Sequence, residues 1–381
     1  MDVAARARFD AQMMGIALRL AARGLGRTSP NPSVGAVIVD EATGEIVSRA
    51  WTAPGGRPHA EPQAIAEAGG RARGATLYVT LEPCSHHGAT PPCADAIVTA
   101  GIGRVVCAIE DPDPRVAGRG LSRLRDAGIA VERGVGAEEA RRVTAGHIMR
   151  VTERRPYVTA KLALDGKSSV PRGGEGQPTW VTGEGARAQG HLLRARSDAI
   201  LVGRRTVIDD DPLLTCRLPG LEDRSPIRVV LARNPAGLAT SRLAQTARER
   251  PLWVFCAAGA DAAALTSAGA RIFSMPLVDG QLWLPAVMEA LAAAGITRLL
   301  IEGGPATWRS FSRAGLIDEV TLFHARAKER TALADDTAFQ ALDRYISTGG
   351  LTIYDRRTIG GDDMLALRRP WLRYGTRPEA D

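Results

Sequence analysis

The sequence predicts an α/β protein built from two domains. Apolar runs rich in Val, Ile and Leu alternate along the chain with Ala-rich stretches of helical periodicity. The length of 381 residues exceeds the roughly 150 residues that one domain usually holds. A charged helical stretch at 138–150 runs into a polar segment that Pro156 closes, and such a segment favours a domain boundary. The predicted domains are residues 1–150 and 151–381.

The individual elements follow from the local pattern, in which Ala-rich stretches predict helices and short apolar runs predict strands. The predicted helices are 11–22, 59–68, 94–100, 138–150, 185–196, 286–294 and 307–313. The predicted strands are 34–39, 76–80, 105–109, 157–162, 199–202, 227–231, 252–255, 299–301 and 320–323. No Gly-x-Gly-x-x-Gly follows these strands, so a nicotinamide cofactor would have to bind without the common dinucleotide fingerprint.

The composition narrows the class of protein. Hydrophobic residues make up 45% and charged residues 24% of the chain, which is ordinary for a globular protein and excludes a disordered chain or a fibre. The net charge of +7 does not indicate nucleic-acid binding, because there is no Lys/Arg run and only 4% of residues are aromatic. Five scattered cysteines favour a reducing compartment, and hence the cytoplasm. No apolar stretch approaches the roughly 20 residues of a membrane span.

The most informative residues form a candidate metal site in the first domain. His59 opens a predicted helix, and Cys84 and Cys93 follow the predicted strand at 76–80. One imidazole and two thiolates are the ligands of a catalytic zinc site that leaves the fourth position for water. Such a cation lowers the pKa of its water from about 15.7 to about 7. Glu61 is two residues from His59, too close to share the metal easily but able to reach its water, so we predict that it moves the proton.

The spacing of the cysteines leaves alternatives open. A His-x-Glu motif followed by Pro-Cys and a second cysteine is typical of zinc deaminases, in which two residues usually separate the cysteines. Here eight residues separate Cys84 from Cys93. Both cysteines could be ordinary buried thiols, or His86 or His87 could replace one of them as a ligand. A structural zinc site would need four protein ligands, and so would require one of those histidines.

The first domain resembles a known family. The stretch 81–93, with Thr-Ser-Pro-Asn-Pro-Ser-Val-Gly at 28–35 before it and His-Ala-Glu at 59–61 between them, is similar to the bifunctional riboflavin biosynthesis deaminase/reductases. The resemblance implies a cytidine-deaminase-like α/β/α domain followed by a dihydrofolate-reductase-like α/β domain. It implies zinc-dependent deamination of a phosphorylated diaminopyrimidine, then reduction of its ribosyl group to ribityl with NADPH. It also implies that His59, Cys84 and Cys93 hold the zinc, that Glu61 is the acid/base and that Asn31 binds the substrate.

The second domain resembles the reductase half of that family at 199–217 and 301–305. Gly303 and Gly304 stand between a predicted strand and helix, where backbone N–H groups can approach a cofactor phosphate. Arg233 follows another strand and could pair with the 2′-phosphate of NADPH. The catalytic residues that the resemblance implies are Lys161 and Asp210. The implied substrate-binding residues are Arg194, Leu214, Arg217 and Glu302. The implied cofactor-binding residues are Ala163, Trp180, Thr206, Asp210, Arg233, Gly303, Gly304 and Pro305.

Three segments depart from the family pattern. Residues 161–166 are two residues shorter than the family's Lys-x-Ala-x-Ser-x-Asp-Gly and lack its serine, residues 174–180 have no serine before Trp180, and residues 324–328 lack the usual Ala-Pro-Lys-Leu-Leu-Gly ending. The alternative is a zinc nucleoside or nucleic-acid base deaminase with a degenerate second domain. The cysteine spacing and the second-domain motifs favour the bifunctional enzyme. We expect a homo-oligomer that acts on a phosphorylated pyrimidine and binds neither nucleic acid nor a membrane.

Overall fold

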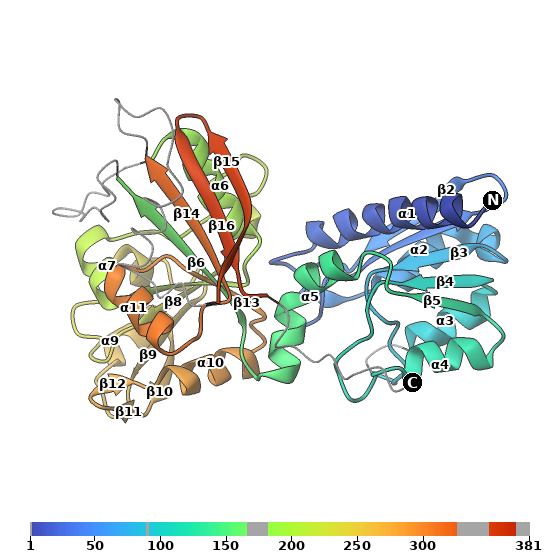
Figure 1. Cartoon of the computed structure of the whole chain (residues 1–381). Helices are drawn as coiled ribbons and strands as arrows, with labels where there is room; N and C mark the ends of the chain where they lie inside the picture. The colour runs from blue at the N-terminus through green and yellow to red at the C-terminus, as the bar shows by residue number, and fades with distance from the viewer. Residues whose placement is uncertain (1, 89–90, 166–181, 326–349, 371–381) are drawn as a thin grey trace. The chain divides into compact units, whose positions relative to one another are not determined.

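The computed structural model describes residues 2–88, 91–165, 182–325 and 350–370, in two compact units (Figure 1). The first unit comprises Met1–Pro156 with Ala292–Thr297, and the second comprises Tyr157–Leu291 with Arg298–Asp381. Helix α5 (Ala137–Thr152) continues past residue 150, where we expected the first domain to end. The change of unit comes after Pro156.

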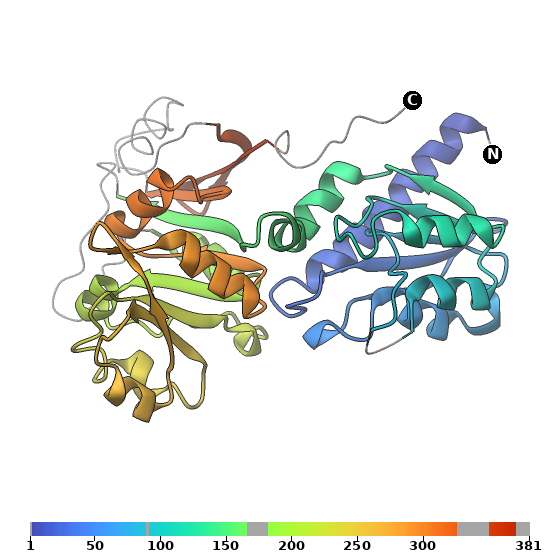
Figure 2. The same cartoon turned by 90° about the horizontal axis from the view of Figure 1, so that it is seen from below.

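The first unit is built around a five-stranded sheet with helices on both faces (Figure 1 and Figure 2). The strand order is β2-β1-β3-β4-β5, with β1 antiparallel to both neighbours and β3, β4 and β5 parallel. The strands are β1 (Gly35–Asp40), β2 (Glu45–Trp51), β3 (Thr76–Val79), β4 (Arg104–Cys107) and β5 (Ala130–Arg133). Because helices cover both faces, β1 and β3 are buried along almost their whole length.

The helices of the first unit pack in two groups. Helix α1 (Val3–Arg23) packs on β1 and beside α5. Helices α2 (Ala60–Ala68), α3 (Cys93–Ala100) and α4 (Arg119–Asp126) pack in a row, with α3 between the other two. This row brings the N-terminal end of α2 close to the N-terminal end of α3, where the predicted metal ligands lie.

The second unit contains a nine-stranded sheet in the order β10-β9-β8-β7-β13-β6-β14-β16-β15. The strands from β10 to β14 are parallel, and β16 and β15 are antiparallel to their neighbours. Their bounds are β6 (Tyr157–Leu164), β7 (Ala199–Gly203), β8 (Ile227–Leu231), β9 (Leu252–Ala257), β10 (Arg271–Met275), β13 (Arg298–Ile301), β14 (Glu319–Ala325), β15 (Thr352–Ile359) and β16 (Asp362–Arg368). A hairpin of β11 (Leu277–Val278) and β12 (Gln281–Leu282) is separate from it.

The helices of the second unit follow its parallel strands. They are α6 (Glu184–Ala195), α7 (Arg204–Asp210), α8 (Arg242–Gln245), α9 (Ala263–Ala268), α10 (Leu284–Ala293) and α11 (Pro305–Arg313). Strand β13 lies between β6 and β7. From β7 to β10 the chain adds strands toward one edge of the sheet, and with β13 and β14 it returns toward the other edge. The carboxyl ends of parallel strands at such a reversal are where ligands usually bind in α/β sheets.

All nine predicted strands are present, with ends that differ from the prediction by at most two residues. Helix α1 begins eight residues before the predicted start, since the side chain of Asp2 caps it by accepting from Ala5 N at 2.6 Å. The elements that the analysis missed are β2, β5, β10, β11, β12, β15, β16, α4, α7, α8 and α9. Strands β2 and β15 are sheet edges with several exposed positions, so they lack a continuous apolar run. Within the described part of the chain, no helix could span a membrane.

Candidate functional sites

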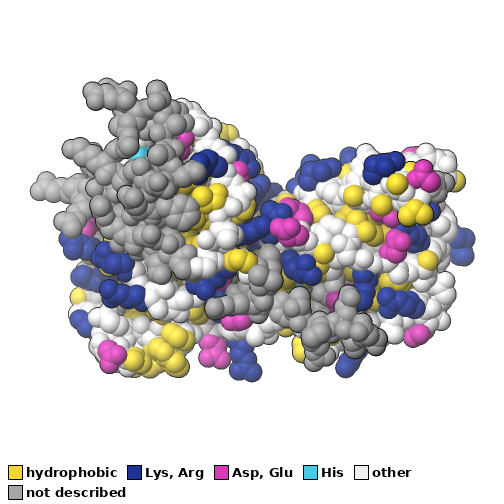
Figure 3. Space-filling model, in the orientation of Figure 1, with side chains coloured by type: hydrophobic (Ala, Val, Ile, Leu, Met, Phe, Trp, Pro, Cys, Tyr) yellow, Lys and Arg dark blue, Asp and Glu magenta, His cyan; other side chains and the backbone are white. Residues whose placement is uncertain are grey.

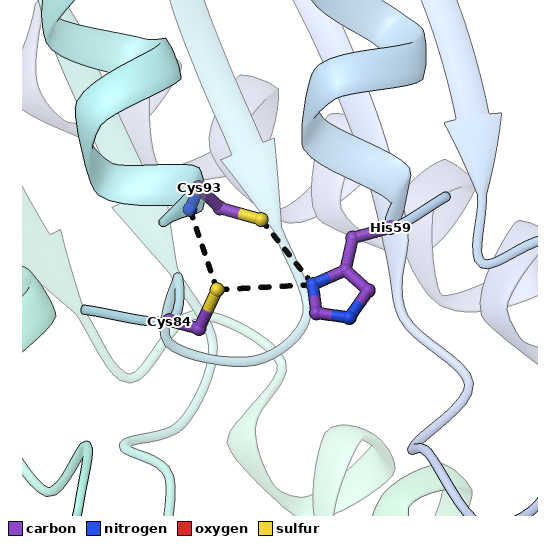
Figure 4. Close-up of side chains that lie close together, drawn as sticks. All are labelled: His59, Cys84 and Cys93. Atoms are coloured by element: carbon purple, nitrogen blue, oxygen red, sulfur yellow. Dashed lines mark hydrogen bonds between the residues drawn. The ribbon is translucent and has the colours of Figure 1, made fainter. Parts of the chain in front are cut away.

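Three predicted metal ligands converge in the first unit (Figure 4). His59 is the N-cap of α2, Cys93 is the first residue of α3, and Cys84 lies in the loop after β3. His59 Nδ1 lies 3.3 Å from Cys93 Sγ and 3.8 Å from Cys84 Sγ. The three ligand atoms all lie within 4.8 Å of one another. An imidazole and two thiols that face one point are a donor set that suits Zn²⁺.

The electrostatics of the three side chains favour a cation. The hydrogen bond with Cys93, together with His59, lowers the pKa of the Cys84 thiol to about 4. The hydrogen bond with Cys84 raises the pKa of the Cys93 thiol. The backbone N–H of Cys93 also donates to Cys84 Sγ at 3.3 Å. Cys84 is therefore the more readily deprotonated of the two thiols, and the thiolate is the form of cysteine that binds metals.

Glu61 is placed to exchange protons beside this cluster. It stands in the first turn of α2, and only 3% of its surface is exposed. Burial raises the pKa of its carboxyl group to about 7, although the nearby His59 acts in the opposite direction. A carboxyl group with a pKa near neutrality can both accept and donate a proton at pH 7.

The alternative ligands do not join the cluster. Among the described residues, the only group of His, Cys, Asp and Glu side chains that converges as a metal site is His59, Cys84 and Cys93. His86 and His87 lie in the loop between the cysteines, and neither is in this group. Three protein ligands fit a catalytic site with an open position better than a closed structural site.

Two polar side chains shape the approach to His59. Asn31, the predicted substrate residue, donates from Nδ2 to Gly56 O at 3.1 Å, so it packs against the turn that precedes His59. Gln63 donates from Nε2 to Trp51 O, Pro58 O and His59 O, each at 2.9 Å. Gln63 was not predicted from the sequence, because its hydrogen-bond partners are carbonyl groups that only the folded chain brings together.

In the second unit, Arg194, Glu302 and Lys161 form a buried cluster. Arg194 donates from Nε and Nη2 to the two oxygens of Glu302 at 2.7 and 2.8 Å, and Lys161 Nζ lies 4.0 Å from Glu302 Oε2. Burial alone would raise the pKa of Glu302, but the charge and hydrogen bonds of Arg194 lower it to about 2. Burial lowers the pKa of Lys161. In the described part of the chain Lys161 forms no ion pair with Asp210, so the expected Lys–Asp pair is replaced by a pair with Glu302.

The segment 214–217 is held against α6. Arg194 Nη1 donates to Thr215 O at 2.9 Å, and Arg217 N donates to His191 Nδ1 at 3.3 Å. Leu214 is buried and has a φ of 55°, a left-handed conformation that costs energy for a residue with a side chain. His191 was not among the residues predicted from the sequence. Its spacing of three residues from Arg194 on one helix face is a signal that could have found it.

Four of the predicted cofactor residues, Thr206, Gly303, Gly304 and Pro305, follow the carboxyl ends of β7 and β13. Gly304 is the N-cap of α11 and Pro305 its first residue, while Thr206 stands in the first turn of α7. A Cβ atom at Gly304 would lie 3.9 Å from Thr206 Oγ1, so the two helix N-termini face one region. Helix N-termini are a common place for a phosphate to bind. Ala163 lies in β6 and Asp210 ends α7, whereas Trp180 lies outside the described residues.

A cavity of about 620 Å³ opens at the ends of β8 and β9, a size typical of ligand pockets. Mostly small residues line it, at 234–237, 239, 257–262, 264 and 265. Arg233 immediately precedes the first of these segments, and its Nη1 donates to Gly280 O at 2.8 Å. In this structure the guanidinium group of Arg233 therefore contacts the β11–β12 hairpin.

Comparisons with known proteins agree with this geometry. Residues 7–109 match the family described as the cytidine and deoxycytidylate deaminase zinc-binding region, which contains all three proposed ligands. Residues 156–327 match the RibD C-terminal domain. The fold and the His/Cys/Cys site therefore define a deaminase-type zinc protein with a second α/β unit attached.

Relatives that cover most of the chain specify the family. The chain is 40% identical to the riboflavin biosynthesis protein RibD of Aquifex aeolicus over 83% of its own length and 86% of the relative, and 40% identical to that of Escherichia coli over 83% and 87%. The solved structure of Acinetobacter baumannii RibD superposes with a TM-score of 0.80 at 31% identity and covers 96% of this chain and 99% of that one. The chain belongs to the RibD family of riboflavin biosynthesis proteins. The predicted family and both predicted fold classes are confirmed.

Proposed function

We propose that the protein deaminates diaminohydroxyphosphoribosylaminopyrimidine in its first unit and reduces 5-amino-6-(5-phosphoribosylamino)uracil with NADPH in its second. Both activities stand in the name of the Thermotoga maritima protein, whose structure is 31% identical, has a TM-score of 0.80 and covers 96% of this chain and all of that one. The observation that carries the proposal is the convergence of His59, Cys84 and Cys93 beside the buried Glu61.

In the deaminase site, His59, Cys84 and Cys93 would hold the metal, and Glu61 would move the proton. Zinc, when bound, supplies a water whose pKa is lowered toward neutrality. Glu61 takes a proton from the attacking water and passes it to the pyrimidine ring nitrogen and then to the leaving ammonia. Burial raises the pKa of this carboxyl group, which supports its acting both as a base and as an acid. Asn31, which packs against the turn before His59, hydrogen-bonds the substrate.

In the reductase site, the N-terminal ends of α7 and α11 would hold the cofactor, which supplies a hydride. The cofactor residues are Ala163, Trp180, Thr206, Asp210, Arg233, Gly303, Gly304 and Pro305. Arg217 binds the substrate phosphate, with Arg194, Leu214 and Glu302 around it. Lys161 donates a proton as hydride reaches the sugar carbon, and Asp210 orients the sugar. The lowered pKa of Lys161 makes its ammonium group a better proton donor.

The proposal includes a homo-oligomer in the cytoplasm that acts on small molecules alone. On the face shown in Figure 3, Lys and Arg side chains lie scattered among acidic ones over both units. Nucleic-acid binding favours basic residues gathered on one face. The five cysteines form no disulfide, which supports a reducing compartment.

The test is to incubate the purified protein with the diaminopyrimidine phosphate, with and without NADPH, and to follow ammonia release and NADPH absorbance. We expect ammonia in both reactions, and NADPH consumption that follows its release. Ammonia without NADPH consumption would support the monofunctional deaminase with a degenerate second unit. Absence of ammonia from a preparation that contains zinc would refute the proposal.

A further inference from the structure

Glu82 is a buried carboxylate that stands two residues before the proposed zinc ligand Cys84. Only 3% of its surface is exposed, and the side chain enters none of the chemistry described above. A buried carboxylate without compensating partners would be costly. Its partners therefore indicate what the residue does.

The partners of Glu82 are four backbone N–H groups on a separate segment. Gly118 N and Asp111 N donate to Oε2 at 2.9 and 3.2 Å, and Gly120 N and Leu121 N donate to Oε1 at 2.9 and 3.1 Å. Three of the four donors belong to the N-cap and first turn of α4. A carboxylate is the side chain best suited to these donors, because each of its oxygens can accept two hydrogen bonds.

Residues 118–121 pack closely against Glu82 and Pro83, the two residues before Cys84. A Cβ atom at Gly120 would lie 2.0 Å from Pro83 O, so only glycine lets the first turn of α4 come this close. The backbone of Glu82 is tied down as well, since its N–H donates to Ile109 O at 3.0 Å. Cys84 O in turn accepts from Ala94 N at 3.2 Å, which connects this turn to the start of α3 and to Cys93.

We propose that Glu82 is a positioning residue of the metal centre. Its carboxylate holds the first turn of α4 against Glu82–Cys84 and thereby sets the position of the Cys84 thiolate relative to His59 and Cys93. Gly120 acts with it, because it allows the contact with Pro83. The inference rests on the proposed zinc site, and it adds to that site two residues that touch neither metal nor substrate.

The test compares zinc affinity in four variants of the full chain. Glu82→Gln keeps the size of the side chain but replaces one acceptor oxygen with an NH₂ group that faces two N–H donors. Glu82→Asp keeps both oxygens on a shorter chain. Gly120→Ala keeps the Glu82 side chain but adds a Cβ atom 2.0 Å from Pro83 O and 3.1 Å from Glu82 Oε1. The matched control is Asp10→Asn, because Asp10 is an equally buried carboxylate of the same unit and accepts its hydrogen bonds from Arg104 and Tyr78.

We expect Glu82→Gln and Gly120→Ala to bind zinc about 10- to 100-fold more weakly than wild type in competition with a chelator, the usual effect of losing a residue that supports a ligand. Glu82→Asp should recover part of the affinity. In cobalt-substituted protein, the thiolate-to-cobalt absorption should change in Glu82→Gln and Gly120→Ala but not in Asp10→Asn. Denaturant unfolding of the zinc-free proteins separates these effects from a general loss of stability.

Zinc affinity and cobalt spectra like those of Asp10→Asn, in both Glu82→Gln and Gly120→Ala, would overturn the inference. If both variants fail to fold while Asp10→Asn folds, Glu82 serves the folding of the unit and the inference is also wrong. If only one of the two variants folds, the zinc affinity of that variant tests the inference. A wild-type protein that binds no zinc would instead refute the proposed zinc site.

Discussion

Arg194 and Glu302, 108 residues apart in the sequence, form a two-pronged ion pair with N–O distances of 2.7 and 2.8 Å. Both side chains are largely buried, at 15% and 8% exposure. The third guanidinium nitrogen of Arg194, Nη1, donates to Thr215 O at 2.9 Å. One guanidinium group thus connects α6, the end of β13 and the segment that carries Arg217, and this connection leads to the first two predictions.

Replacing Arg194 by Ala should destabilise the second unit by about 3 kcal/mol, because the buried Glu302 carboxylate loses both hydrogen bonds from Arg194 and keeps Lys161 Nζ, 4.0 Å away, as its counter-charge. The matched control is Arg205→Ala, whose ion pair with Asp209 lies on the surface and should contribute at most about 1 kcal/mol. Denaturant unfolding measures both values. Equal, small effects would show that Arg194 is not needed to neutralise Glu302.

The same pair predicts how stability depends on pH. The pKa of Glu302 is lowered from an ordinary 4.5 to about 2, so its contribution is fully present above pH 4.5 and is lost as the pH falls toward 2. Glu302→Gln has no such group to titrate. Unfolding free energies measured between pH 6 and pH 3 should therefore fall less steeply in this variant than in wild type, and parallel curves would contradict the shift.

Cys84→Ser should lose most of the zinc, about one ion per wild-type chain, because a serine hydroxyl is a much poorer zinc ligand than a thiolate. Cys107→Ser is the control. That cysteine is buried in the same unit but donates to Ile109 O, a bond that serine can keep. Metal analysis of the purified proteins checks both. Full zinc content after loss of both Cys84 and Cys93 would end the assignment.

Glu61→Gln should keep its zinc and its fold but deaminate about 10²-fold more slowly, since the amide cannot move the proton. Glu67→Gln, on the exposed part of the same helix, should leave the rate unchanged. Ammonia release and zinc content are the measurements. Reduction of a synthetic deaminated intermediate should continue at the wild-type rate. A parallel fall in both activities would argue against two separate sites.

Arg233→Ala should raise the KM for NADPH and leave the KM for NADH nearly unchanged, because only NADPH carries the 2′-phosphate. The guanidinium group would have to leave Gly280 O to reach that phosphate. Arg248→Ala is the matched control, an exposed arginine that also donates to a backbone carbonyl. Steady-state kinetics with NADPH and with NADH measures the two KM values. Equal changes with NADPH and NADH would remove Arg233 from the cofactor site.

Local sequence patterns predicted the interior of the fold better than its edges. The parallel strands β7 and β9 are continuous apolar runs and are buried along almost their whole length, as is typical of parallel strands covered on both faces. Short helices such as α7 and α8 have too few residues for a periodic signal. The candidate metal ligands could be predicted because imidazole and thiol groups are rare and occur here in a recognisable order.

The sequence by itself determined which reactive side chains the candidate metal site contains, at positions 59, 61, 84 and 93, and which helices and strand carry them. Only the tertiary structure decided which groups meet. Lys161 pairs with Glu302 rather than with Asp210. Gln63 donates to three carbonyl groups. Glu82 accepts hydrogen bonds from four backbone N–H groups. Such partners come from segments far apart in the chain or from the backbone itself. Their meeting depends on sheet order and close packing, which no local pattern records.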